Sequence, residues 1–118
     1  MSQPASVECQ IYRNVPVFLP PTYFDEKIGA ILGQMMGEQF QKGHTRFVVD
    51  LQKCKIINSR GLSSLLDLAI KCLDDYRGRL GLVNTDPTKE NLFGLVGLST
   101  LIVSAPNLDE AVNLVTKA

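Results

Sequence analysis

The segment from Asn58 to Gly61 brings together residue types that could carry chemistry: an amide, a hydroxyl, a guanidinium and a glycine. It follows a short apolar run and precedes residues with helical spacing. We expect Ser59 to be the N-cap of this helix, accepting a backbone N–H two or three residues on. The same position suits a phosphoryl group, because the dipole and the free N–H groups of a helix N-terminus favour an anion. Ser59 is therefore a candidate phosphorylation site as well as a candidate cap.

Other residues with catalytic or metal-binding chemistry are few and scattered. The single histidine, His44, lies in a predicted turn, and a cysteine nucleophile would need Cys54 or Cys72 to meet it in space. The third cysteine is Cys9, and the sequence has no CxxC pair, no cluster of metal ligands, no phosphate loop and no dinucleotide fingerprint. We therefore expect no catalytic residue, no metal, no cofactor and no disulfide, and the residues give no support for nucleotide binding.

Composition narrows the class of protein. The 118 residues fit one domain, spanning 1–118, and 45% of them are hydrophobic, which is typical of a globular protein. Twelve basic residues balance twelve acidic ones, so no basic excess exists to drive binding to nucleic acid or to a membrane surface. The sequence has neither the apolar run of a membrane span nor the N-terminal pattern of a signal peptide. Three widely spaced cysteines, an odd number, indicate reduced thiols and a cytoplasmic protein.

Strand and helix signals alternate along the first half of the chain. Alternating apolar residues at Val7–Ile11 and Val15–Leu19 predict a β-hairpin, which a pair of prolines ends. Thr22 then opens a helix whose apolar residues recur at helical spacing up to Phe40. This helix is the first of the elements expected to cover a sheet.

Three glycines, Gly29, Gly33 and Gly37, lie on one face of this predicted helix. Each costs about 1 kcal/mol relative to alanine in a helix interior, so we expect another element to pack very close to that face. That element belongs either to the same chain or to a second copy in a homodimer, and the sequence leaves both open.

The second half of the chain alternates in the same way. Three more strands are expected at 46–51, 79–84 and 100–105, and helices begin after Asn58, at Asp86 and at Asn107. The order β-β-α-β-α-β-α-β-α predicts an α/β fold with a mixed β-sheet of about five strands, its later strands parallel, and about four helices. Loops at the carboxyl ends of strands often carry function, so Pro20–Thr22 and Asn84–Asp86 are expected to flank the 58–61 loop.

The segment from Phe47 to Leu66 carries the most specific resemblance to a known family. Its strand "FVVDLQKCKIIN" and the following "NSRGLSSLLDL" resemble the STAS domain, and more closely the bacterial anti-sigma factor antagonists. In that family a strand ending in "DL" is followed by Asp-Ser-Ser-Gly-Leu at the start of a helix. "RLGLVN", "LVGL" and "LDEAV" extend the resemblance over nearly the whole chain. The resemblance implies a single-domain STAS-like fold.

The same resemblance implies a role in transcription regulation through binding to another protein. In that family the unphosphorylated antagonist binds an anti-sigma factor with a GHKL-type serine kinase fold, which releases the sigma factor. Phosphorylation of a serine in this loop then breaks the complex. That serine corresponds to Ser59, and the implied partner-binding residues are Asn58, Ser59, Arg60, Gly61 and Leu62. The chain itself is then not an enzyme.

Two residues depart from the family pattern. Asn58 stands where the family has aspartate, which removes a charge but keeps hydrogen-bonding capacity. Arg60 stands at the second serine position, and its guanidinium could hold a phosphate on Ser59 or an acidic partner surface. These departures keep a second function open, a STAS scaffold subunit of a larger assembly that is not phosphorylated. A third, an enzyme using Cys54 or Cys72, has neither a second histidine nor a cofactor loop to support it.

Overall fold

The computed structural model describes residues 6–117 of the chain. Its strands are β1 (Glu8–Tyr12), β2 (Val15–Leu19), β3 (Tyr23–Phe24), β4 (Arg46–Asp50), β5 (Ile56–Ile57), β6 (Arg79–Val83) and β7 (Val103–Ala105). Its helices are α1 (Glu26–Gln41), α2 (Ser59–Asp74), α3 (Pro87–Leu95) and α4 (Leu108–Thr116), with a 3-10 turn, η1 (Leu98–Thr100), before β7.

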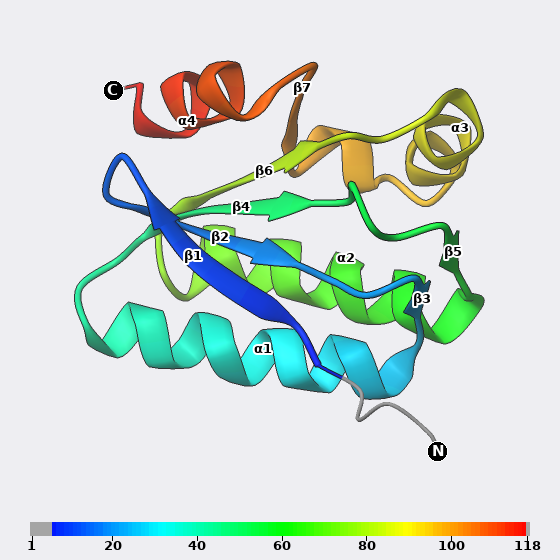
Figure 1. Cartoon of the computed structure of the whole chain (residues 1–118), viewed down its shortest axis with the longest axis horizontal. Helices are drawn as coiled ribbons and strands as arrows, with labels where there is room; N and C mark the ends of the chain where they lie inside the picture. Colours follow the sequence, from blue (N-terminus) through cyan, green and yellow to red (C-terminus); the bar gives the residue numbers. More distant parts are fainter. Residues whose placement is uncertain (1–5, 118) are drawn as a thin grey trace.

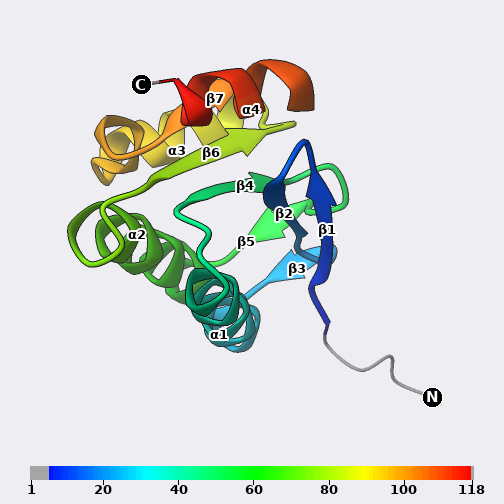
Figure 2. The same ribbon diagram turned by 90° about the vertical axis from the view of Figure 1, so that its left-hand side faces the viewer.

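Five strands form one mixed sheet in the order β1-β2-β4-β6-β7. β1 and β2 are an antiparallel hairpin, and β2, β4, β6 and β7 run parallel to one another. Figure 1 shows α1 and α2 on one face of the sheet and α4 on the other, and Figure 2 shows the same layers from the side. The predicted α/β fold, with a mixed five-stranded sheet and four helices, is confirmed.

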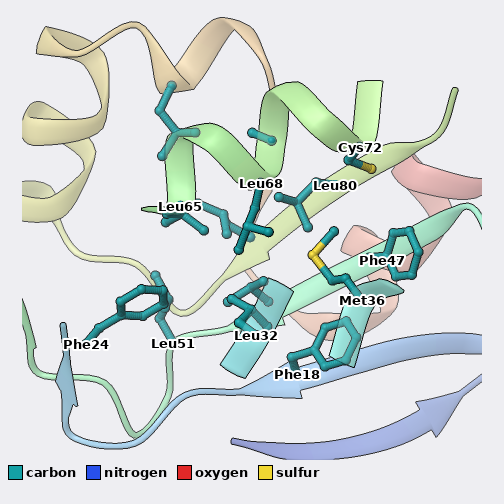
Figure 3. Close-up of a cluster of buried hydrophobic side chains, with 14 of the residues drawn as sticks. Phe18, Phe24, Leu32, Met36, Phe47, Leu51, Leu65, Leu68, Cys72 and Leu80 are labelled. Carbon is teal, nitrogen blue, oxygen red and sulfur yellow. The ribbon is translucent and has the colours of Figure 1, made fainter. Parts of the chain in front are cut away.

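The side chains of the central strands divide the core into two clusters. Phe18, Phe47 and Val49 belong to the cluster under α1 and α2, whereas Val17 and Val48 belong to the cluster under α4. Figure 3 shows the first cluster, where aromatic rings and leucines of the sheet meet the two helices. Because the central strands are buried on both faces, they have continuous apolar runs in the sequence in place of a strict alternation.

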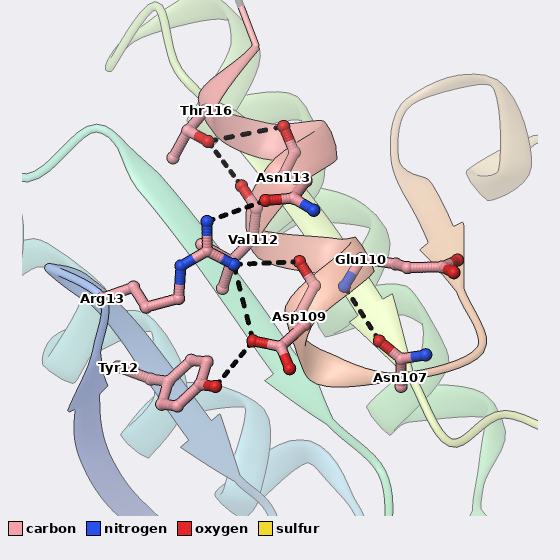
Figure 4. Close-up of polar contacts among 8 residues, drawn as sticks. All are labelled: Tyr12, Arg13, Asn107, Asp109, Glu110, Val112, Asn113 and Thr116. Atoms are coloured by element: carbon pink, nitrogen blue, oxygen red, sulfur yellow. Dashed lines mark hydrogen bonds and ion pairs between the residues drawn. The ribbon is translucent and has the colours of Figure 1, made fainter.

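Polar contacts fix the β1–β2 turn to α4 (Figure 4). Arg13 and Asn14 have positive φ angles of 51° and 66°, as a two-residue hairpin turn requires. The Arg13 guanidinium donates to the Asn113 side chain at 2.8 Å and to the Asp109 carbonyl at 3.4 Å. The Tyr12 hydroxyl donates to the Asp109 carboxylate at 2.6 Å, and this hydrogen bond raises the pKa of the Tyr12 phenol. The edge hairpin is thereby tied to the helix that covers its face of the sheet.

α1 begins later than the sequence predicts. Thr22 does not open the helix, because the Asp25 side chain caps it by accepting the Ile28 N–H at 3.0 Å. The Thr22 carbonyl instead accepts the N–H groups of Lys55 and Ile56, at 2.8 and 3.1 Å. These bonds lead into the parallel pairing of β3 with β5, a second, two-stranded sheet. β5 lies within the predicted extended segment "FVVDLQKCKIIN". β3 was not predicted, because a strand of two residues is too short to show a periodicity.

The glycine face of α1 packs against α2. A Cβ at Gly29 would lie 2.3 Å from the Ser64 Cβ, and one at Gly33 would lie 3.1 Å from a leucine methyl group of α2. A Cβ at Gly37 would lie 3.5 Å from the Tyr76 hydroxyl, an ordinary contact. Close packing within the chain, one of the two predicted explanations, therefore accounts for this face. Gly29 is buried, whereas Gly33 and Gly37 are half-buried, so the contact with a second copy stays a prediction.

We predict opposite effects of alanine at two of these glycines. Gly29→Ala should lower the free energy of unfolding by about 1–3 kcal/mol, because α2 must move away from the new methyl group. Gly37→Ala should leave it unchanged or raise it by up to about 1 kcal/mol, because the site has room and alanine favours the helix. Urea unfolding of both variants measures this. A loss of stability in Gly37→Ala that matches Gly29→Ala would contradict the packing described here.

Candidate functional site

Three connections meet at the carboxyl edge of the parallel strands, as the sequence predicts. β2 leads into β3, β4 leads through β5 into α2, and β6 leads into α3 (Figure 1). Asp50, buried at the end of β4, accepts the Gln52 N–H at 2.9 Å and the Asn84 side-chain amide at 2.8 Å. These bonds hold the start of the β4–β5 connection against the end of β6. They help to fix the position at which α2 begins.

Asn58, and not Ser59, caps α2. The Asn58 Oδ1 accepts the Gly61 N–H at 2.8 Å, and its Nδ2 donates to the Tyr23 hydroxyl at 3.1 Å. Its backbone N–H donates to the Phe24 carbonyl at 3.1 Å. The prediction that Ser59 is the N-cap is therefore wrong. Asparagine caps a helix as well as serine does, and here β3 also supplies acceptors for the Asn58 side-chain amide and backbone N–H.

Ser59 is the first residue of α2, and its side chain is exposed. Across residues 6–117 its hydroxyl makes no hydrogen bond, since the capping contacts belong to Asn58. The first N–H groups of a helix have no partner within the helix, so this hydroxyl lies at the positive end of the helix dipole. The candidate phosphoacceptor is thus free to meet a second protein.

Arg60, the next residue, contacts α1. Its guanidinium lies 3.0 Å from the Glu26 carboxylate, and the two side chains are 78% and 66% exposed. An exposed ion pair of this kind contributes about 0–1 kcal/mol. A phosphate or a partner carboxylate can therefore replace Glu26 as the partner of Arg60 at little cost in stability.

Gly61 and Leu62 lie beneath this surface. Both are buried, and Leu62 belongs to the main hydrophobic cluster. A Cβ at Gly61 would lie 2.2 Å from the Phe24 carbonyl oxygen, so glycine allows the first turn of α2 to approach β3 closely. Of the five residues predicted to bind a partner, Gly61 and Leu62 are therefore buried beneath the surface. The other three, Asn58, Ser59 and Arg60, are partly or fully exposed on it.

Two exposed apolar residues next to Ser59 were not expected from the sequence. Tyr23 in β3 is 48% exposed and Ile56 in β5 is 55% exposed, and the two are paired across the small sheet. Tyr23 also holds the Asn58 amide, which places its ring beside the start of α2. The only signal in the sequence is that Ile56 precedes the 58–61 loop, because the β3–β5 pairing that joins Tyr23 to it is long-range.

The three cysteines are free thiols, with Cys9 exposed and the other two buried. Burial raises the pKa of the Cys54 thiol, and it raises the pKa of Cys72 to about 11. Both thiols are therefore protonated at neutral pH, whereas a nucleophilic cysteine needs a lowered pKa. The hypothesis of a cysteine enzyme gains no support from either environment.

His44 is half-buried in the connection between α1 and β4.

Within residues 6–117, no group of three His, Cys, Asp or Glu side chains is placed to hold a metal ion. Over the same part of the chain, no helix combines the length and the apolar character needed to cross a bilayer.

No model of a known protein family matches the sequence, and no curated protein sequence matches it significantly. Solved structures resemble it in fold. An anti-sigma factor antagonist from Mycobacterium paratuberculosis has a TM-score of 0.76 and 23% identity, over 98% of this chain and 98% of that one. An anti-sigma-factor antagonist (STAS) domain protein from Planctomyces limnophilus has a TM-score of 0.76 and 13% identity, over 94% and 98%. The Bacillus cell-fate determinant SpoIIAA in its phosphorylated form has a TM-score of 0.69 and 20% identity, over 93% and 99%.

The chain has the STAS fold. The fold implied by the segment from Phe47 to Leu66 is confirmed, and this segment forms β4, β5 and the start of α2. Within this fold, the first turn of α2 is placed by the Asn58 cap, by the close approach of Gly61 to β3 and by the Asp50 contacts at the end of β4.

We predict that stability distinguishes the cap from its neighbour. Asn58→Ala should lower the free energy of unfolding by about 1–2 kcal/mol, because the Gly61 N–H loses its acceptor. Ser59→Ala should change it by less than about 0.5 kcal/mol, because the exposed hydroxyl has no partner to lose. Urea unfolding of the two variants measures the difference. Equal losses would restore Ser59 as the cap.

We predict that a disulfide-exchange reagent at pH 8 modifies Cys9 and leaves Cys54 and Cys72 unmodified until the chain is unfolded. Because the pKa of Cys72 is raised from 9.0 to about 11 by burial, the folded state favours the neutral thiol. This preference contributes in full to the free energy of unfolding below pH 9, and the contribution is lost as the pH rises toward 11. Timed labelling with peptide mapping tests this. Fast reaction of Cys54 or Cys72 in the folded chain near neutral pH would revive the enzyme hypothesis.

Proposed function

We propose that this chain is an anti-sigma factor antagonist that binds an anti-sigma factor with a serine kinase fold and is switched by phosphorylation of Ser59. The observation that carries the proposal is the exposed Ser59 hydroxyl at the start of α2, relieved of capping by Asn58. The fold neighbours support the role, since anti-sigma factor antagonists are among them. One neighbour is a phosphorylated form, which supports the switch.

The start of α2 suits a phosphate chemically. A phosphoryl group on Ser59 would bring about −1.5 to −2 charges to the positive end of the helix, where unpaired N–H groups favour an anion. The neighbouring Arg60 is held only by an exposed ion pair with Glu26 and can turn to the phosphate. Asn58 adds no negative charge next to it, unlike an aspartate at that position.

The same phosphate would oppose binding of the partner. Ser59 lies beside the exposed apolar pair Tyr23 and Ile56, which a partner would remove from water. A dianion beside that pair keeps its hydration shell and raises the cost of desolvating the surface. The unphosphorylated chain is the binding form in this account, and the switch needs no change of fold. The chain performs no chemistry itself and acts in the cytoplasm, where its thiols stay reduced.

A scaffold role without phosphorylation is the second candidate. It is favoured by the guanidinium of Arg60 where the family has a serine, and by its contact with Glu26. In that role the surface at Ser59 would bind constitutively within a larger assembly. Oligomerisation through the glycine face of α1, where Gly33 and Gly37 are half-buried, stays a prediction of this role.

We predict that lysate of the source cells with labelled ATP phosphorylates the wild-type chain and Ser63→Ala but not Ser59→Ala. Ser63 is the matched control, since it is also an exposed serine of α2, one turn further on. Label that persists in Ser59→Ala would contradict the assigned site. Label on none of the three would favour the scaffold role.

We further predict that Ser59→Asp binds the purified kinase at least about tenfold more weakly than Ser59→Ala, because the carboxylate adds charge to the binding surface. Isothermal titration calorimetry or surface plasmon resonance with the two variants measures the ratio of their dissociation constants. Equal affinities would rule out a charge-based switch at this position.

A further inference from the structure

A groove lies between β5 and the start of α3, next to the proposed phosphorylation site. It has a volume of about 500 Å³ and is lined by Lys55, Ile56, Ile57, Pro87, Lys89 and Leu92, among others. Ile57 is only two residues before Ser59, and Figure 1 shows β5 between α3 and the first turn of α2. The groove therefore lies close to the start of α2, which carries Ser59.

Most of the groove is apolar, and part of that apolar surface is exposed. Ile56 is 55% exposed, and Ile57 and Leu92 are half-buried. Exposed apolar patches of this kind commonly mark sites of protein binding. The groove is open to solvent, and its volume of about 500 Å³ admits a large apolar side chain.

The two lysines that line the groove differ in burial and in ion pairing. Lys89 is nearly buried, and its amino group pairs with the Asp86 carboxylate, the α3 N-cap. Lys55 is exposed, and within residues 6–117 it has no ion-pair partner. The groove thus presents one free cation beside an apolar floor. A partner that matches it carries a carboxylate next to an apolar side chain.

The proximity of Ser59 indicates which protein this partner is. A stable protein–protein interface covers about 800 Å² on each partner, so a kinase centred on Ser59 must extend over neighbouring surface. Tyr23 and Ile56 are the exposed large apolar residues on the two strands that flank the start of α2. We infer that the groove is the docking site for the kinase that modifies Ser59, receiving an apolar side chain of that kinase while Lys55 pairs with an adjacent carboxylate. This inference rests on the proposed function.

Substitutions in the groove should raise the KM for phosphorylation and leave kcat unchanged, because they remove docking contacts and not the hydroxyl. Ile56→Thr keeps a β-branched residue in β5 and should raise KM about five- to tenfold. Lys55→Glu should raise it by at least a similar factor, with an effect that weakens as salt is added. The probe is the kinase activity purified from source cells by its labelling of the wild-type chain, assayed at varied chain concentration.

Matched controls lie at the other end of the sheet. Ile11→Thr makes the same substitution in a strand residue that is 53% exposed, and Lys42→Glu makes the same charge reversal at an exposed position after α1. Both should leave KM unchanged. Thermal unfolding confirms that all four variants are folded.

The remaining outcomes overturn the inference in distinguishable ways. Label on the wild type that Ile56→Thr and Lys55→Glu do not affect would overturn the docking site and leave the proposed function standing. Absence of any Ser59 label on the wild type would overturn both. A change in sedimentation of Ile56→Thr alone, without kinase, would assign the groove to a second copy of the chain.

Discussion

The hydrogen bond from the Gly61 N–H to the Asn58 side chain determines how the functional surface is built. The first N–H groups of a helix have no partner within it, and a side chain that accepts from one of them is engaged in the cap. Because Asn58 fills that role and also holds Tyr23, the next residue begins α2 with its hydroxyl in solvent. The exposure of Ser59 is thus a consequence of the identity of its neighbour.

The rest of the fold supports this arrangement from below. Gly61 lets the first turn of α2 lie against the Phe24 carbonyl, and Gly29 lets α1 lie against the same helix one turn later. Asp50 ties the β4–β5 connection to the end of β6. Each contact is buried or nearly so, and each constrains α2 from a different element. The resulting surface carries the polar side chains of Ser59 and Arg60 next to the exposed apolar residues Tyr23 and Ile56.

Much of this could be predicted from the sequence, because the relevant signals are local. The hairpin, the caps at Asp86 and Asn107 and the alternation of strands with helices follow from short-range patterns, and they are confirmed. The errors arose where a long-range contact decided between local alternatives. Asn58 and Ser59 are both good caps, and only the contact with β3 selects Asn58. β3 was not predicted for the same reason, and neither was its pairing with β5, which brings Tyr23 beside Ile56.

The most direct test of the account is the phosphorylation state of the chain isolated from its source cells. Trypsin cleaves after Lys55 and Arg60, and the peptide 56–60 that it releases contains one hydroxyl side chain, that of Ser59. A mass increase of one phosphate on that peptide therefore assigns the site without ambiguity. The account predicts that a fraction of the peptide carries phosphate and that the fraction changes with growth conditions. A peptide that is unmodified under every condition tested, or phosphate found only elsewhere on the chain, would contradict it.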